Sequence, residues 1–237
     1  MYSTMIGLLL LISGIVSGLL LPRVYERCIN IILERNNQED GTQTTEYCKT
    51  IKDYILLGTV NGAAYFMLFL KSGISNGNVT IDNVLVTILY CICTTLLLVL
   101  VVIDWNTYEI PPGINVCILL LGLIRIGFDY ENWSLYVIGF FAVSGFLYLL
   151  YRISGGTWIG GGDVKLMAAA GLLLGWKLIL VAFVVGCVFG SIIHLAIIAI
   201  KKGERMLAFG PYLSLGIFFS MIWGEQLASW YLSLLKI

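Results

Sequence analysis

The chain alternates between long apolar runs and short polar connections. A membrane-spanning helix needs about 20 apolar residues, and about 17 can suffice, so most of the runs are long enough to cross a bilayer. The sixth run is short and rich in alanine and glycine, and it can span only by close packing with local thinning or tilting. The pattern predicts an all-α, polytopic membrane protein with about eight transmembrane helices. The apolar runs fall at about residues 5–21, 54–70, 84–103, 113–128, 134–151, 164–176, 178–200 and 212–233.

The basic residues predict how these helices are oriented. Ten of the fourteen Lys and Arg residues lie in three connections, 22–53, 152–165 and 201–206. The positive-inside rule therefore places these connections in the cytoplasm. The segment 164–200 then begins and ends on the same side, so it must cross twice, with a turn at Gly175-Trp176. A single helix over this segment would be roughly 55 Å long, which is far more than a bilayer needs.

The composition narrows the classes of partner. The chain is 59% hydrophobic and 12% charged, whereas a soluble domain is about 25% charged, so the lipid bilayer is an expected partner. The formal net charge of zero gives no basic surface, so no nucleic-acid partner is expected. The six cysteines form no CxxC pair, and the single histidine, His194, lies in an apolar run. Since a closed zinc site needs about four ligands, we expect no metal site.

The N-terminal part of the chain contains one sizeable polar segment, residues 22–53, with mixed charges. We expect a small cytoplasmic loop or a helical hairpin there rather than a separate domain. Residues 1–83 are accordingly predicted to form an N-terminal membrane region of two helices and this loop. Residues 84–237 are predicted to form a six-helix core.

Two aspartates stand at the predicted membrane boundary. Asp163 follows the glycines Gly160, Gly161 and Gly162 and opens the sixth run, while Asp104 closes the third. An ionised Asp beside hydrocarbon is costly unless water, a partner or a function holds it there. If the helices bring them together, two such carboxylates at one depth form a general acid–base pair, because repulsion between like charges keeps one of them protonated near neutral pH. The glycines would leave the backbone open to an extended substrate.

Each of these residues also has a plainer interpretation. Asp163 is an ordinary helix cap favoured by the helix dipole, and Asp104 is a boundary residue that reaches water. The glycines would suit a phosphate loop, but no Gly-Lys-Ser or Gly-Lys-Thr follows them. Lys165 is an interfacial anchor or, alternatively, tunes Asp163. Pro111-Pro112 prevents the third helix from continuing and precedes the fourth.

Three stretches in this order resemble a known family. They are "IDWNTYEIPPGIN", "GGGDVKLMAAAGLLLGW" and "FGPYLSLG", and they are similar to motifs of the type IV prepilin peptidases, which are membrane aspartyl proteases of the GxGD class. The resemblance extends from roughly residue 84 to the end of the chain. The N-terminal third matches the family only at Gly18, Leu21 and Arg27.

The resemblance implies an aspartic endopeptidase with Asp104 and Asp163 as its catalytic residues. Gly160, Gly161, Gly162, Lys165 and Pro111 would then belong to the supporting active-site loops. The implied reaction is removal of a basic leader peptide from prepilin or pseudopilin-like precursors at the cytoplasmic face of the bacterial inner membrane. Residues 84–237 would form the catalytic core.

The resemblance leaves a second activity open. Many bacterial members carry two CxxC pairs in the loop that here holds only Cys28 and Cys48. Those pairs are associated with N-methylation of the new N-terminus by S-adenosylmethionine. We therefore expect no cofactor for the peptidase activity, and S-adenosylmethionine only if a methyltransferase activity is retained.

Two other functions remain alternatives. A multi-pass transporter or ion channel could use Asp104 and Asp163 as a proton or cation site. Against it, both aspartates stand at one membrane face, and no inverted repeat is visible. A non-catalytic assembly factor is the other alternative, and the presence of both aspartates argues against it. The oligomeric state stays open.

Overall fold

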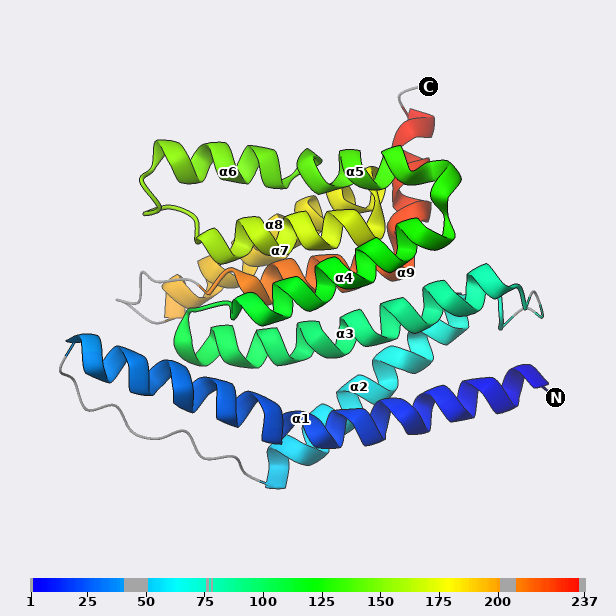
Figure 1. The fold of residues 1–237 in the computed structure, drawn as a ribbon, viewed down its shortest axis with the longest axis horizontal. Helices are drawn as coiled ribbons and strands as arrows, with labels where there is room; N and C mark the ends of the chain where they lie inside the picture. Colours follow the sequence, from blue (N-terminus) through cyan, green and yellow to red (C-terminus); the bar gives the residue numbers. More distant parts are fainter. Residues whose placement is uncertain (1, 41–50, 76, 78, 201–207, 235–237) are drawn as a thin grey trace. The chain divides into compact units, whose positions relative to one another are not determined.

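The structure of the protein is a computed structural model that describes residues 2–40, 51–75, 77, 79–200 and 208–234. Throughout these ranges the regular elements are helices (Figure 1). The helices form two compact units, Met1–Glu109 and Ile110–Ile237. The predicted all-α fold is confirmed, and every predicted apolar run coincides with a helix or, for 134–151, with a pair of helices.

The first unit contains three helices, α1 (Tyr2–Asp40), α2 (Ile51–Lys71) and α3 (Ile81–Thr107). The three helices pack against one another, and the α1–α2 contact is the most extensive. Glycines allow this contact, since a Cβ added to Gly18 would lie 2.6 Å from the carbonyl oxygen of Leu57. The buried Asn61 amide donates to the Gly14 carbonyl at 3.0 Å and lies 3.3 Å from the Thr95 hydroxyl on α3. Small residues and a shared polar side chain therefore hold this unit together, as is usual for helices in lipid.

Helix α1 extends much further than the first apolar run. Residues 22–40, expected in a loop or a helical hairpin, continue the helix. Figure 1 shows a change of direction in it, which we attribute to Pro22. The physical reason is an apolar stripe along one face of the helix. Charged residues interspersed with it make it hard to recognise in the sequence. Tyr25, Ile29 and Ile32 are buried, and their spacing puts them on one face of a helix. The rest of the expected loop, residues 41–50, lies outside the described residues.

The second unit is built around a short central helix. Helix α7 (Gly161–Leu174) packs against all the other α-helices of this unit, and every residue from Leu166 to Leu174 is buried. Between α5 and α6, the predicted run at 134–151 is interrupted at Val143. The surrounding helices are α4 (Pro112–Phe128), α5 (Trp133–Ala142), α6 (Ser144–Ile153), α8 (Trp176–Ile200) and α9 (Gly210–Leu234), with the short 3-10 helix η1 (Tyr130–Asn132) between α4 and α5.

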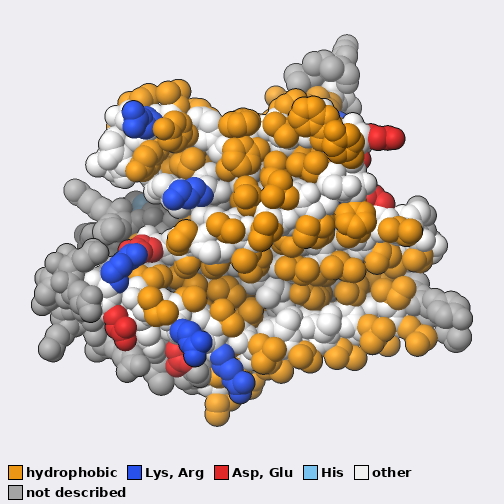
Figure 2. Space-filling view, in the orientation of Figure 1, with side chains coloured by type: hydrophobic (Ala, Val, Ile, Leu, Met, Phe, Trp, Pro, Cys, Tyr) orange, Lys and Arg blue, Asp and Glu red, His pale blue; other side chains and the backbone are white. Residues whose placement is uncertain are grey.

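The helices are apolar enough for a bilayer. Among the described residues, five segments qualify as spans by length and hydropathy, and Pro112–Phe128 is a shorter apolar helix. Figure 2 shows hydrophobic side chains over most of the visible surface of the helices. The predicted polytopic membrane protein is confirmed. The five segments are Thr4–Arg35, Ile51–Lys71, Ile81–Thr107, Tyr130–Ile153 and Trp176–Ala196.

Glycine contacts hold α7 in place. A Cβ added to Gly171 on α7 would meet the carbonyl oxygen of Gly139 on α5, well inside van der Waals distance, and a Cβ added to Gly139 would meet the carbonyl of Gly171 in the same way. On the α4 side, a Cβ added to Gly122 would lie 2.9 Å from the Cβ of Leu172. The backbones thus approach more closely than any side chain would allow.

The variant Gly171→Ala tests this contact. We expect it to destabilise the protein by about 1–3 kcal/mol, the usual cost of overpacking, because the added methyl group has no room beside Gly139. The measurement is the midpoint of thermal unfolding of the purified protein in detergent. Gly145→Ala on α6 is the matched control, since a Cβ there has nothing within 4 Å. Equal midpoints for the two variants would contradict the contact.

Candidate active site

Asp104 lies in the last turn of α3, as the sequence predicts, with 4% of its surface exposed. The helix ends at Thr107, and Tyr108 is its C-cap residue, whose N–H donates to the Asp104 carbonyl at 2.9 Å. Tyr108 has φ 55° and ψ 23°, and it is the one non-glycine residue with positive φ in the part of the chain that the structure describes. This conformation costs about 1–2 kcal/mol, and such local strain is concentrated at functional sites. The turn after Asp104 is thus both sharp and strained.

The polar extension of α1 reaches the segment that follows this turn. Arg35 forms an ion pair with Glu109, and the two side chains are 55% and 40% exposed. An exposed pair of this kind contributes at most about 1 kcal/mol. The ion pair matters for position rather than for stability, because it connects the helical part of the segment 22–53 to the chain just after Asp104.

The proline pair starts α4. Pro111 is the N-cap residue, with φ −59° and ψ 129°, and Pro112 is the first helical residue. Proline suits the first helical position because its fixed φ is helical and its missing N–H would have no partner there. The expectation that these prolines separate two helices is confirmed.

Asp163 lies in the first turn of α7, also as predicted, with 8% of its surface exposed. Gly160 is the N-cap residue of that helix, and its carbonyl accepts the N–H of Asp163 at 3.1 Å. A Cβ added to Gly160 would lie 3.2 Å from Oδ2 of Asp163, so a side chain at that position would crowd the carboxylate. The positive end of the helix dipole favours an ionised carboxylate at this place.

The glycine segment packs against the chain that precedes α4. A Cβ added to Gly162 would lie 2.9 Å from the Cβ of Ile110. At Gly161 the nearest atom to such a Cβ is 3.7 Å away, so this position has more room. Lys165, one turn into α7, is exposed. Within the second unit, therefore, the Ile-Pro-Pro segment and the Gly-Gly-Gly-Asp segment lie side by side.

Asn115 on α4 is a further polar residue of this site that sequence reasoning missed. It is 6% exposed, and its Nδ2 donates to the Gly162 carbonyl at 3.4 Å. Its Oδ1 is buried and, among the described residues, has no hydrogen-bond partner. A buried acceptor without a partner is costly. The signal was an amide inside an otherwise apolar run, one turn after Pro112.

The two aspartates belong to different units, Asp104 to the first and Asp163 to the second. Of the cysteines discussed for a metal site, Cys28 is partly buried, and Cys48 lies outside the described residues. No group of three or more His, Cys, Asp or Glu side chains placed to hold a metal ion occurs among the described residues. The basic connection at 201–206 also lies outside them.

Comparisons with known proteins point to one family. Residues 91–195 match the family model described as the type IV leader peptidase family, and this range contains Asp104, Asn115 and Asp163. No solved structure gives a significant match.

Three similar bacterial proteins carry one name. The prepilin leader peptidase/N-methyltransferase of Aeromonas salmonicida is 30% identical over 156 residues, which are 62% of this chain and 53% of that protein. The protein of the same name from Pectobacterium carotovorum subsp. carotovorum is 34% identical over 140 residues, 55% of this chain and 50% of that protein. The one from Bacillus subtilis is 29% identical over 148 residues, 59% of this chain and 57% of that protein.

The chain spans about half the length of the curated relatives it matches. Its apolar helices and its relatives indicate a multi-pass bacterial membrane protein. Over residues 91–195, less than half of its length, the chain is similar to the type IV leader peptidase family.

Proposed function

We propose that the protein is a membrane aspartyl endopeptidase that removes the basic leader from type IV prepilin-like precursors. The observation that carries the proposal is the pair of buried aspartates, Asp104 and Asp163, each at a helix end inside the range that matches the family. The proposal includes the meeting of these two carboxylates around the substrate. It places the reaction at the cytoplasmic face of the inner membrane, because the connections on that side of the predicted topology carry most of the basic residues.

The two helix ends support different roles for the two carboxylates. Asp163 lies at the positive end of α7, which favours its ionised form, whereas Asp104 lies at the negative end of α3, which favours its neutral form. We assign Asp163 as the general base that takes a proton from water. Asp104, protonated, donates its proton to the oxygen of the scissile carbonyl as the water oxygen attacks the carbon.

Collapse of the tetrahedral intermediate completes the cycle. The C–N bond breaks, the amine of the new N-terminus takes the proton that Asp163 had accepted, and the proton of the gem-diol returns to Asp104. The products are the leader with a free carboxyl group and the mature protein with a free amine. Neither carboxylate changes its net protonation over the cycle, so the pair needs no cofactor for this step.

The backbone around Asp163 supports access of an extended substrate. Gly160 leaves room beside the carboxylate, and Gly162 allows close packing on Ile110. The Asn115 amide lies at the Gly162 carbonyl and its Oδ1 has no partner among the described residues. We assign Asn115 as a positioning residue that holds the start of α7 and offers Oδ1 to a substrate N–H or a water.

The proposed substrate is a membrane-inserted precursor, a prepilin or pseudopilin, with a basic leader followed by an apolar helix. The relatives' name includes an N-methyltransferase, but this chain has no CxxC pair. If methylation is retained, it uses other residues than such pairs.

Cleavage of a prepilin-type peptide by the purified protein tests the proposal. Asp104→Asn and Asp163→Asn are each expected to reduce the cleavage rate by about 10²–10⁴-fold or more, because an amide can neither accept nor donate the required proton. Asp82→Asn is the matched control, since it removes an exposed carboxylate at the opposite end of α3 and should leave cleavage near the wild-type rate. Near-normal cleavage by either aspartate variant would exclude the pair. Proton or cation flux without cleavage, in reconstituted vesicles, would favour a transporter instead.

Asn115→Leu separates a functional role from a structural one. The Asn115 amide makes one long hydrogen bond, to the Gly162 carbonyl, and its Oδ1 has no partner among the described residues. Replacing it by an apolar side chain of similar size is therefore expected to change the thermal unfolding midpoint little. Cleavage should nevertheless fall by about tenfold, because the substrate or water contact of Oδ1 is lost. Val116→Ala, at the exposed neighbouring position on α4, serves as the control. A variant that loses stability and activity together would show that Asn115 only supports the fold.

A further inference from the structure

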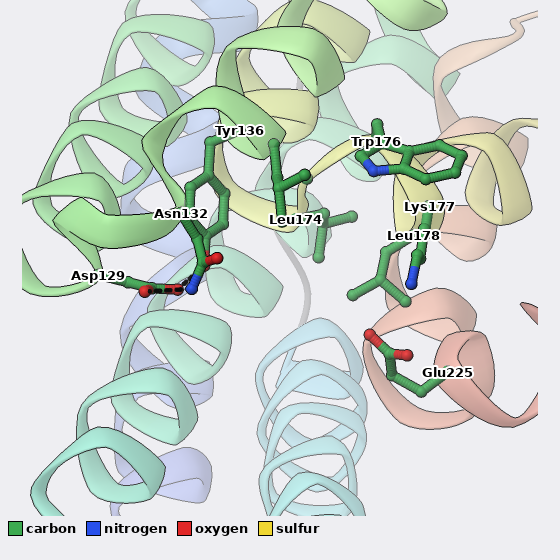
Figure 3. A pocket seen from close by; sticks show the side chains of 10 residues that line it. Asp129, Asn132, Tyr136, Leu174, Trp176, Lys177, Leu178 and Glu225 are labelled. Carbon is green, nitrogen blue, oxygen red and sulfur yellow. Dashed lines mark hydrogen bonds between the residues drawn. The ribbon is translucent and has the colours of Figure 1, made fainter.

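A polar cavity lies at the end of α7 opposite to Asp163. Leu174 and Gly175 line it, so it is roughly 17 Å along the helix from Asp163, at 1.5 Å per residue. Its volume is about 220 Å³. A cavity of about 10–15 Å³ is enough to hold one water, so this cavity can hold a small polar group. The α4–α5 connection, the α7–α8 turn and α9 all contribute to its lining (Figure 3).

One wall of the cavity is a preassembled polar cluster around Asp129. The Asp129 carboxylate accepts hydrogen bonds from Tyr136 Oη at 2.6 Å and from Asn132 Nδ2 at 2.9 Å, and Arg125 lies 3.5 Å away. The hydrogen bond from Tyr136, then that from Asn132, and the charge of Arg125 hold the pKa of Asp129 below its ordinary value, against a smaller opposing effect of burial. Asp129 is therefore ionised and already bound to neighbouring side chains. It lines the cavity but is not available to bind a ligand.

Two opposite charges face the remaining space. Lys177 Nζ and the Glu225 carboxylate point toward the same part of the cavity in Figure 3. Lys177 lies 5.8 Å from the centre of the Trp176 ring. In the part of the chain that the structure describes, neither Lys177 nor Glu225 has an ion-pair partner within 4.0 Å. The cavity thus presents one cation and one anion to a guest.

An apolar groove adjoins the polar cavity. It has a volume of about 600 Å³ and shares the residues Trp176 and Lys177 with the cavity. Leu180 and Val184 line it along α8, and Leu227 and other residues of α9 line it on the other side. Along α8 the groove extends from Trp176 to Val184, about 12 Å at 1.5 Å per residue. An apolar groove of this kind can hold part of an acyl chain.

Aromatic residues identify the depth of this pair of cavities. Trp176, which also lines the polar cavity, and Trp230 and Tyr231 line the groove, and Trp and Tyr are enriched where membrane proteins cross the headgroup region. Lys177, beside Trp176, has the long stem of an interfacial anchor. We infer from these residues that the polar cavity lies at the depth of the lipid headgroups and the groove at the depth of the lipid chains.

We propose that the cavity and the groove together bind one glycerophospholipid with a primary-amine headgroup. The acyl chain occupies the groove, the phosphate pairs with Lys177, and the ammonium group pairs with Glu225. The site lies wholly within the second unit and does not depend on the peptidase activity.

The charges of the site select this headgroup over its alternatives. A phosphoethanolamine group carries one anion and one cation, which complement Lys177 and Glu225. A choline headgroup has no N–H to donate to the Glu225 carboxylate. A glycerol headgroup leaves the anionic phosphate beside Glu225 without a cation, and like charges repel. The ranking of affinities is therefore expected to be ethanolamine first, then choline, then glycerol.

Native mass spectrometry of the purified full chain, titrated with lipids of identical acyl chains, tests the proposal. Wild-type protein is expected to bind phosphatidylethanolamine about tenfold more tightly than phosphatidylglycerol, a factor typical of one charge-assisted contact. Glu225→Gln should reduce this preference to within about threefold, while Lys177→Gln should weaken the binding of all three lipids. Val184→Trp, which fills the groove, should also weaken all three.

Glu131→Gln is the matched control for Glu225→Gln, since Glu131 is an exposed carboxylate on η1 that does not line the cavity. It should keep the wild-type ranking, and thermal unfolding should show that all variants remain folded. Equal binding of the three lipids by wild-type protein, or an unchanged preference in Glu225→Gln, would overturn the proposal. This outcome would leave the peptidase assignment untouched, because the cleavage assay does not involve Lys177 or Glu225.

Discussion

The contact between Gly139 on α5 and Gly171 on α7 is the constraint on which the second unit depends. In lipid, helices gain little from hydrophobic burial against one another, so close van der Waals packing has to hold them together. Here each glycine occupies the space in which the other's side chain would lie. The contact, with that of Gly122 against Leu172, buries α7 and sets the position of both of its ends.

Helix α7 is short for a helix that crosses a bilayer, and its length bears on the role of Asp163. A helix of 14 residues is about 21 Å long, whereas the hydrocarbon core is about 30 Å thick. Either the bilayer thins beside α7 or its ends lie below the headgroups. A carboxylate such as Asp163 at one of these ends is expensive in hydrocarbon. The burial of Asp163 beside three glycines is therefore better explained by a catalytic role than by a contribution to the stability of the fold.

The proposed site combines rigid and strained parts. Pro111 and Pro112 restrict the start of α4, and Ile110 packs on Gly162 at the start of α7. By contrast, Tyr108 adopts a left-handed conformation directly after α3, and Asn115 keeps a buried acceptor without a partner among the described residues. A strained backbone and an unsatisfied buried acceptor both lower local stability. They are expected at functional sites, where the residues are held in the geometry that the reaction needs.

Apolar runs, the proline pair and the positions of Asp104 and Asp163 at helix ends could all be predicted from the sequence. These features are local, because they depend on side-chain polarity and backbone restriction over one or two turns. The helical continuation of α1 beyond Pro22 could not be predicted in this way. Charged residues hide its apolar stripe, and neighbouring helices decide whether Tyr25, Ile29 and Ile32 find a surface to bury against.

The remaining features are decided by contacts between residues distant in the chain. Asn115 looks like any amide in an apolar helix until α7 brings Gly162 to it. Likewise, Lys177 and Glu225 are separated by 48 positions and form one cavity only because α8 and α9 pack side by side. The sequence by itself determined which residues are proposed to be catalytic, since protonation and helix capping are properties of single side chains and short segments. Tertiary structure decided which partners surround them, because close approach of helices depends on whether glycines at distant positions face each other.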